Sequence, residues 1–500
     1  MLNTKLLLDT TMFPVYRRLY DVCCRAAVPV RVSDYNIEIK GEQEESSLNW
    51  VPVTWTSSHI ALIRQPRAFP RPCASRIVPF VQPEFLKGSL HRKHPGVTNL
   101  KTIRLPEELH SAALSVIYSS EVKDLSERAR KLTNFLWSRK RAVESHELRE
   151  RAIALEKKWK EQEQVTDLNH ESFETRIRKK VLSELKKTTY HWTPLKYDSD
   201  LGLVYMVARL AGGYAAVMRA LNEIKKRDSS FTPHSLLDFG SGLGTALWAA
   251  HTHWGDSLRE YVCVDASAAM NSLAERLLTG DTEGNDPLIK HVYFRQFLPV
   301  SPKVQADLVL AAFSLSELST QEAREETLLT LWRKTNSYLV LVENGTKAGH
   351  QTLMEAKDIL LKREDKVSGD VRRPLVFAPC THQLPCPKLL KQPVTPCNFL
   401  QPYDPLPVSG RSEIVQEKFS FLIMSRSELQ KSEMVQWSRL ISPVLRRSRH
   451  VQCEICCSNG ELQQLAITAR HHGRDSYRCT RSSDWGDRLP VIQTEKHTEG

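Results

Sequence analysis

The sequence has no apolar run that approaches the roughly 20 residues needed to cross a bilayer, so we expect no membrane span. Cysteine is scarce, because eleven residues in a chain of 500 do not make a disulfide scaffold. No internal repeat is found, and no tight Cx3Cx2C-type loop is present. The missing loop excludes a radical enzyme that uses a metal cluster to cleave its cofactor.

What the composition does contain is typical of a globular protein with two or three domains. Hydrophobic residues make up 41% of the chain and charged residues 26%. The net charge of +12 and the isoelectric point near 9.1 favour a polyanionic partner, with nucleic acid as the leading candidate. A basic organellar protein without such a ligand is the alternative.

The N-terminal region resembles a targeting segment in its composition. Residues 12–32 hold several arginines, apolar residues and one acid, Asp21, which is typical of a mitochondrial transit peptide. We therefore predict a transit peptide over residues 1–35. Residues 36–85 have scattered prolines and serines without a sustained period, and we expect a disordered or processed lead-in there.

The remaining chain divides into three regions by its hydrophobic pattern. Residues 86–230 show apolar residues at three- and four-residue spacing, which predicts helices, with Gly212 and Gly213 interrupting the last of them. Residues 231–371 alternate short apolar runs with helical segments, which predicts an α/β fold with a parallel sheet covered on both faces. Residues 372–490 are rich in cysteine and basic residues and contain a small β module from residue 437, and residues 491–500 are expected to be a disordered tail.

The α/β region begins with a glycine loop, LLDFGSGLGTALW. A predicted strand ends at Asp238, and a helix follows the loop that contains Gly240, Gly242 and Gly244. Glycine is needed where the backbone turns sharply and a ligand approaches it closely. Asp265 ends the next predicted strand, where a carboxylate can accept hydrogen bonds from both hydroxyls of a ribose. No lysine that could hold phosphates follows the loop, so an adenosine ligand is favoured over a nucleoside triphosphate.

LDFGSGLG followed by VDAS resembles the cofactor site of class I (Rossmann-like) S-adenosylmethionine-dependent methyltransferases. The resemblance implies that Gly240, Gly242 and Gly244 line the methionine and ribose, that Asp265 binds the ribose, and that Asp238 orients the methionine end.

The resemblance does not extend to catalytic residues. In many base methyltransferases the fourth strand ends in an Asn/Asp-Pro-Pro-aromatic clamp or a nucleophilic cysteine, whereas residues 311–318 read AAFSLSEL. We therefore predict cofactor binding and assign no catalytic residue. An active RNA methyltransferase with Ser314 or Glu317 near the acceptor remains the alternative, because ribose and amine methylation can proceed without the clamp.

Six of the eleven cysteines lie in two stretches. Cys380, Cys386 and Cys397 form the first, and CEICC supplies Cys453, Cys456 and Cys457. A zinc ribbon needs two CxxC pairs, and only one is present. An irregular set of four thiolates suits an iron–sulfur cubane at least as well, and thiolates bind either metal. His382 and His450 are possible replacements for a cysteine ligand.

A longer resemblance covers residues 90–490. RKHPG, RLP, KKTTYHW, SLSEL, FAPCTHQLPCP, EKFSFLIMSR and RRSRHVQCEICC occur in the order typical of the mitochondrial methyltransferase-like protein 17 family. The resemblance implies a matrix assembly factor of the small ribosomal subunit, in contact with its ribosomal RNA and proteins. It also implies a [4Fe–4S] cluster bound by Cys380, Cys386, Cys397 and Cys456, with Cys453 and Cys457 as alternatives to the last.

Arginines surround CEICC and predict a surface that contacts RNA. Arg439, Arg446, Arg447 and Arg449 precede the motif, and Arg470, His471, His472, Arg474, Arg478 and Arg481 follow it, near Tyr477 and Trp485. Arginine with interleaved aromatics suits phosphate contacts and stacking on unpaired bases. A solvated surface neutralised by nearby acids is the alternative.

Overall fold

A computed structural model describes residues 77–78, 89–162, 170–190, 192–280, 286–301, 303–362, 374–408, 413–426, 437–490 and 492–493. The predicted transit peptide lies outside these residues, as do Cys23, Cys24 and Cys73. Two short strands, Ile77–Val78 (β1) and Ile492–Gln493 (β15), pair antiparallel with each other.

The central element is a mixed sheet in the order β4-β3-β2-β5-β6-β9-β7, with β8 paired to β9. The first five strands are parallel, and β9 runs antiparallel between β6 and β7. This order confirms the predicted class I methyltransferase fold. Its strands are β2 (Ser235–Phe239), β3 (Glu260–Val264), β4 (Val292–Arg295), β5 (Ala306–Ala312), β6 (Thr335–Asn344), β7 (Leu375–Ala378), β8 (Phe399–Tyr403) and β9 (Val415–Ser425).

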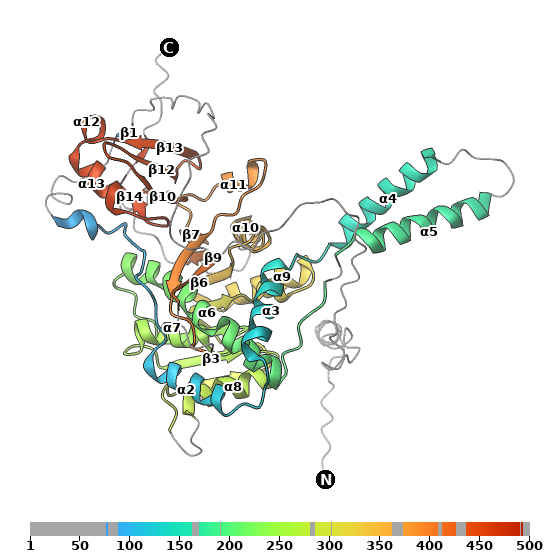
Figure 1. The fold of residues 1–500 in the computed structure, drawn as a ribbon, viewed down its shortest axis with the longest axis horizontal. Helices are drawn as coiled ribbons and strands as arrows, with labels where there is room; N and C mark the ends of the chain where they lie inside the picture. The colour runs from blue at the N-terminus through green and yellow to red at the C-terminus, as the bar shows by residue number, and fades with distance from the viewer. Residues whose placement is uncertain are drawn as a thin grey trace, which may run out of the picture. The chain divides into compact units, whose positions relative to one another are not determined.

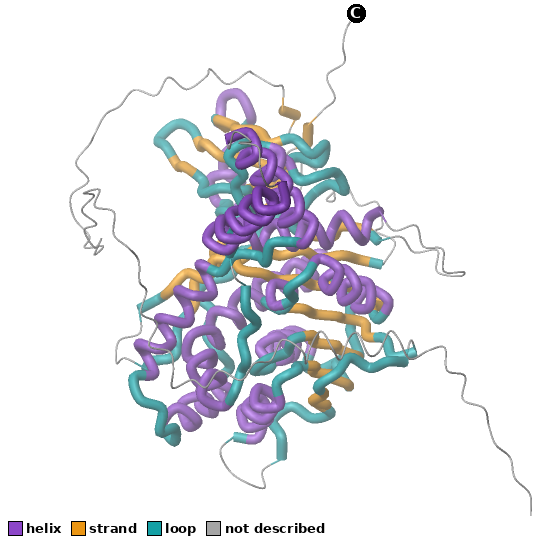
Figure 2. Tube along the Cα trace, turned by 90° about the vertical axis from the view of Figure 1, so that its right-hand side faces the viewer, coloured by secondary structure: helices purple, strands orange, loops and turns teal. Residues whose placement is uncertain are grey.

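Helices cover both faces of the sheet, which explains why its central strands read as continuous apolar runs (Figure 2). Neighbouring strand residues such as Leu236 and Leu237 belong to separate apolar clusters on opposite faces. One face packs against α2 (Glu107–Tyr118), α3 (Leu125–Ser138), α6 (Ser199–Arg227), α7 (Thr245–Trp254) and α8 (Ala268–Thr279). The other packs against α9 (Gln321–Arg333) and α10 (Lys347–Lys362).

The α6 helix corrects one sequence-based prediction. Gly212 and Gly213 do not interrupt it, since α6 is continuous and buried over most of its length. Gly212 instead permits close packing, because a Cβ atom there would lie 2.5 Å from Oε2 of Glu417. Although α6 is long and apolar enough to cross a membrane, most of its apolar stretch is buried in the protein core.

The predicted N-terminal helices are present. Besides α2 and α3, they include α4 (Ser145–Gln162) and α5 (His170–Thr188), which pack against each other (Figure 1). A 3-10 helix, η2 (Ser89–Arg92), precedes them.

Residues 437–490 form the predicted small β module, called the C-terminal module below (Figure 1). Its elements are β10 (Ser438–Leu440), β11 (Leu445–Arg446), β12 (Val451–Cys456), β13 (Leu462–Ile467), α12 (Ala469–His472), α13 (Arg474–Ser482) and β14 (Arg488–Leu489). The module has an apolar core of its own that includes Val451, Ile455 and Leu465. The central sheet continues past residue 372, because β7 and β9 belong to it. The domain boundary predicted at residues 371/372 therefore falls between strands of one sheet.

Candidate functional site

The glycine loop connects β2 to α7 in a conformation that requires glycine. Gly240, Gly242 and Gly244 have φ angles of 66°, 52° and 74°, in the left-handed region that side chains with a Cβ atom disfavour. A Cβ atom on Gly240 would also lie 2.4 Å from the Ser314 hydroxyl oxygen. Backbone conformation and the close approach of Ser314 therefore both require glycine at the carboxyl end of β2.

The two predicted aspartates lie beside this loop. Asp265 follows β3, and its carboxylate accepts hydrogen bonds from the backbone N–H groups of Gly242 (2.9 Å) and Ser267 (2.8 Å). Burial raises the pKa of Asp238 to about 8, and the neighbouring Asp265 carboxylate adds to this increase. Within the described residues, Oδ2 of Asp238 is buried without a hydrogen-bond partner. A buried carboxyl oxygen of this kind is stabilised by a donor from a bound ligand.

The carboxyl end of β5 holds the residues considered for catalysis, and both are engaged in other contacts. The Ser314 hydroxyl donates to the carbonyl oxygen of Phe239 at 2.8 Å. Glu317 forms an ion pair with Arg139 at 2.6 Å. Phe313, between β5 and Ser314, has a φ of 59°, which is strained for an aromatic residue.

A pocket adjoins the ends of β5 and β6. The pocket is small, about 50 Å³, and its lining includes Tyr197, Tyr205, Phe313 and Glu343. Burial raises the pKa of Glu343 to about 7, and within the described residues Oε2 of this side chain has no hydrogen-bond partner. The pocket therefore contains a buried carboxyl group that can bond a ligand.

Three of the predicted metal ligands lie on the segment between β7 and β8. Cys380 follows β7, Cys386 precedes α11 (Pro387–Leu390), and Cys397 precedes β8. Burial raises the pKa of the Cys397 thiol to about 12, and the thiols of Cys386 and Cys380 contribute to the increase. These three thiols are thus electrostatic neighbours.

Cys456, the last residue of β12, belongs to the same group. Burial raises the pKa of its thiol above the usual range, and the neighbouring thiols of Cys380, Cys397 and Cys386 raise it further. Its Sγ atom lies 3.4 Å from Nε2 of His382. The name thiol site is used below for Cys380, Cys386, Cys397 and Cys456.

The other two cysteines of CEICC face elsewhere. Cys453 and Cys457 pack in the apolar core of the C-terminal module. Burial alone raises the pKa of Cys453, to about 12, without a contribution from another thiol. Among the described residues, no group of three or more Cys, His, Asp or Glu side chains has the spacing to hold a single metal ion.

Most of the predicted arginine surface is exposed. The exposed residues, called the basic surface below, are Arg446, Arg447, Arg449, Arg470, His471, Arg474, Arg478 and Arg481. Three of them share one face of α13, at the i, i+4 and i+7 positions. Of the nearby acids that could neutralise this surface, Asp484 forms an ion pair with Arg446. Asp475 contacts His91 instead, and Asp487 is buried. Arg439 corrects the prediction, because it is 2% exposed and has no place on this surface.

Residues 199–490 match the family described as mitochondrial small ribosomal subunit Rsm22. The chain belongs to the Rsm22 family. The match covers α6, the central sheet, the segment that carries the cysteines and the C-terminal module.

Two curated relatives extend this result. The chain is 50% identical over 408 residues to the human protein named ribosome assembly protein METTL17, mitochondrial. The aligned region covers 82% of this chain and 87% of that protein. It is 23% identical over 325 residues to the Rsm22-cox11 tandem protein 2, mitochondrial, of Schizosaccharomyces pombe. That aligned region covers 58% of this chain and 43% of that protein. The family and these relatives confirm the predicted mitochondrial location.

Among solved structures, magnesium protoporphyrin IX methyltransferase from Synechocystis PCC 6803 with bound SAM has a TM-score of 0.27. It is 13% identical and covers 53% of this chain and 100% of that one. The assignment of the fold rests instead on the strand order of this Rsm22-family chain.

Sequence reasoning missed three features of the site. Glu343 is the single acid in the apolar run YLVLVEN, and this polar interruption of a buried strand was a usable signal. Nε2 of His350, on α10, lies 3.6 Å from Sγ of Cys386, and no pattern in the sequence of this helix predicted that contact. The RKHPG motif supplies His94, which contacts Ser483, and Gly96, whose carbonyl oxygen accepts from Arg488 N at 2.8 Å. This motif therefore attaches the N-terminal segment to the C-terminal module.

Proposed function

We propose that this chain is an assembly factor of the mitochondrial small ribosomal subunit that supports mitochondrial translation. It binds ribosomal RNA and S-adenosylmethionine in the matrix and carries a structural [4Fe–4S] cluster, without methyl transfer. The proposal rests above all on one observation: the basic surface and Cys456 of the thiol site belong to the same small module. Membership of the Rsm22 family supports the ribosomal role.

The basic surface is suited to ribosomal RNA because it presents several guanidinium groups on one continuous part of the module. Arg481 Nη1 donates to the carbonyl oxygen of Arg447, and Arg446 Nε donates to that of Arg481, both at 2.8 Å. These contacts join β11 to the end of α13. Arginine pairs with phosphate in two parallel hydrogen bonds, so the array fits an RNA backbone and its affinity falls steeply with salt.

S-adenosylmethionine fits the glycine loop by the chemistry of the residues present. Asp265 would bind the ribose hydroxyls, and the free oxygen of Asp238 would accept from the methionine amino group. The bound molecule supplies an activated methyl group. Both candidate catalytic side chains at the end of β5 are engaged, Ser314 with the carbonyl oxygen of Phe239 and Glu317 with Arg139.

Calorimetric titration with S-adenosylmethionine tests this part. We expect binding by the unmodified chain and at least a tenfold weaker affinity for Asp265→Ala, since two hydroxyl contacts are lost. Equal affinity of the two proteins would remove Asp265 from the site.

A [4Fe–4S] cluster fits the thiol site for two reasons. The four donors are soft thiols, and each thiolate disfavours the ionisation of the others unless a cation is present. The two segments that carry these cysteines also contact each other, since the Thr381 hydroxyl donates to the carbonyl oxygen of Cys456 at 3.5 Å. Cys380, Cys386, Cys397 and Cys456 would hold the cluster, which would cross-link the segment between β7 and β8 to β12.

Protein purified without oxygen tests the cluster. We expect about four iron and four sulfide ions per chain and a broad visible absorption. Stoichiometric zinc without colour would refute the iron–sulfur assignment and leave the four-thiol site.

The cluster would also support RNA binding, because it would hold the C-terminal module against the sheet. Cys456→Ser is expected to lose iron, to unfold at a lower temperature and to bind small-subunit RNA more weakly. Cys453→Ser is the matched control, since it makes the same change on the same strand inside the module core. Unchanged RNA affinity of an iron-free Cys456→Ser variant would contradict the coupling.

An active RNA methyltransferase is the second candidate function. The observation that favours it is the pocket beside β5 and β6, in which Glu343 has a free carboxyl oxygen. Incubation with labelled S-adenosylmethionine and small-subunit RNA distinguishes the two. Label incorporation that Asp265→Ala abolishes would establish the enzyme and overturn the non-catalytic proposal.

A further inference from the structure

Arg439 is buried between the two segments that carry the thiol site. It lies on β10, where its Cα partner on the neighbouring strand β12 is Cys456. Its Nε atom donates to the carbonyl oxygen of Pro379 at 3.0 Å, and Pro379 directly precedes Cys380. One side chain therefore contacts the segment of the first cysteine and belongs to the strand paired with the last.

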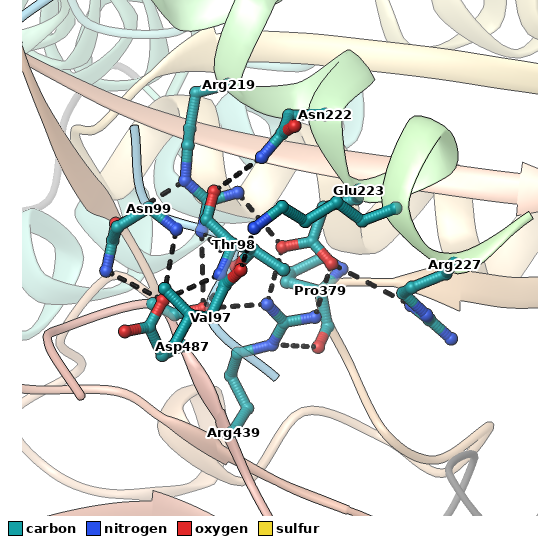
Figure 3. A network of polar contacts seen from close by, with 12 residues as sticks. Val97, Thr98, Asn99, Arg219, Asn222, Glu223, Arg227, Pro379, Arg439 and Asp487 are labelled. Carbon is teal, nitrogen blue, oxygen red and sulfur yellow. Dashed lines mark hydrogen bonds and ion pairs between the residues drawn. The ribbon is translucent and has the colours of Figure 1, made fainter. Parts of the chain in front are cut away.

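The guanidinium group of Arg439 is fixed from its other side by α6 and by the turn before β14 (Figure 3). Nη1 and Nη2 donate to the two carboxylate oxygens of Glu223 at 2.7 and 3.1 Å, and Nη1 also donates to the carbonyl oxygen of Gly486 at 2.7 Å. Glu223 is fully buried. Burial by itself would raise its pKa, but the cations of Arg439 and Arg219 outweigh burial and hold the pKa far below its usual range. Glu223 is therefore an anion at neutral pH.

Positive charge exceeds negative charge around this pair. The arginine network consists of four guanidinium groups, on Arg219, Arg227, Arg439 and Arg488, and two carboxylates, on Glu223 and Asp487. Lys226 also interacts with Glu223 and Asp487, so basic groups outnumber carboxylates in this largely buried region. Burial lowers the pKa of Arg227 to about 10 and that of Arg488 well below its usual range. Among the described residues, Nη2 of Arg488 is buried without a hydrogen-bond partner, although the guanidinium group lies over the ring of Trp437.

An anionic group close to the network would offset this excess. Arg439 connects the network to the thiol site, because it bonds the residue before Cys380 and is paired with Cys456 across β10 and β12. A cubane bound by four thiolates carries a net negative charge, and nearby positive charge stabilises its reduced state.

We propose that Arg439 is the positioning residue of the thiol site and that the arginine network is the counter-charge of the group bound there. Through Glu223 it also links the site to α6, and through Gly486 to the turn before β14 and the attached N-terminal segment. The inference rests on the proposed function in that the bound group is the iron–sulfur cluster.

The test uses the full chain purified without oxygen and measures its reduction potential and its rate of iron loss to a chelator. Arg439→Gln removes a cation, so the reduction potential shifts to a more negative value. Glu223→Gln removes an anion and leaves Arg439 in place, so the potential shifts to a more positive value. Opposite shifts report charge near the cluster, which a purely structural role would not produce. Arg446→Gln, an equal change on the exposed face of the same module, leaves the potential unchanged.

Arg439→Lys separates position from charge. Lysine keeps the cation but cannot bond Glu223, Pro379 and Gly486 together, so iron loss accelerates by about 10–100-fold, as for other residues that orient metal ligands. An unchanged rate in Arg439→Lys, or shifts of the same sign in Arg439→Gln and Glu223→Gln, would overturn the proposal. Where Arg439 variants fail to fold, Glu223→Gln carries the test alone, and a potential equal to that of the unmodified protein overturns the proposal.

Failure of the proposed function gives a different result. If the unmodified chain contains no iron or sulfide, the cluster assignment fails. Amide hydrogen exchange then tests the positioning role by itself: Arg439→Lys is expected to speed exchange in the 380–386 segment, and Arg446→Lys is not. Equal exchange in both variants overturns the positioning role as well.

Discussion

The adjacent glycines of α6, Gly212 and Gly213, are expected to respond to alanine in opposite directions. At Gly213 a Cβ atom would make ordinary contacts of 3.8 Å with Phe313 and Thr245. Alanine is the better helix former, so Gly213→Ala is expected to stabilise the protein by about 0.5–1 kcal/mol.

At Gly212 the same change meets a buried ion pair. The new Cβ atom would lie 2.5 Å from Oε2 of Glu417, whose other oxygen accepts from Arg209 at 3.0 Å. Both charged side chains are about 5% exposed or less. Displacement of the carboxylate breaks the pair at a cost of about 3–5 kcal/mol. After subtraction of the gain in helix propensity, Gly212→Ala is expected to destabilise the protein by roughly 2–4 kcal/mol.

Urea unfolding followed by circular dichroism measures both variants, with Gly213→Ala as the matched control. The Glu417→Ala background provides a further check, because only the 3.3 Å approach to Tyr403 remains there and Gly212→Ala should cost far less. A Gly212→Ala protein as stable as Gly213→Ala would refute the packing of α6 on β9.

Three further predictions concern other parts of the chain. Gly96→Ala would bring a Cβ atom to 2.0 Å from the carbonyl oxygen of Arg488, so hydrogen exchange in β14 should accelerate about tenfold or more; unchanged exchange would contradict this contact. Burial raises the pKa of Asp238 from 3.8 to about 8. Between pH 3.8 and about pH 8 the native state therefore keeps a proton that the unfolded state releases, so the stability of the native state falls as the pH rises through this range. Asp238→Asn should therefore be more stable than the unmodified protein at pH 8 by a few kcal/mol and equal to it near pH 4, as measured by unfolding at both pH values. Arg478→Gln should reduce the slope of log affinity against log salt for small-subunit RNA by about 0.7–0.9, whereas Arg130→Gln, on α3, should leave it unchanged.

Local patterns in the sequence were sufficient for much of the fold. Five apolar runs separated by helical segments predicted the parallel part of the sheet, because strands covered on both faces need apolar residues at nearly every position. The glycine spacing of the loop was equally informative, since Gly240, Gly242 and Gly244 all adopt left-handed φ angles. Asp265 was predicted beside this loop because adjacent parallel strands end at the same edge.

Other features depend on contacts between residues far apart in the chain. The position of β9 between β6 and β7 arises from pairing that no local period encodes. Gly212 was predicted to interrupt the helix, because Glu417, the residue that it packs against, lies about two hundred residues later in the chain. Arg439 read as a surface residue because the sequence around it is rich in arginine.

The sequence by itself determined the α/β class of this protein, the glycine loop and the presence of two cysteine stretches, since each depends on residue types at short spacing. Only the tertiary structure decided which cysteine of CEICC joins the other three and which arginine leaves the surface. On β12, Cys456 lies near Cys380, whereas Cys453 packs inward. Arg439 is buried because Glu223 and two carbonyl oxygens satisfy its guanidinium group. The physical reason is that burial and charge compensation are sums over neighbours in space, and a sequence lists neighbours only along the chain.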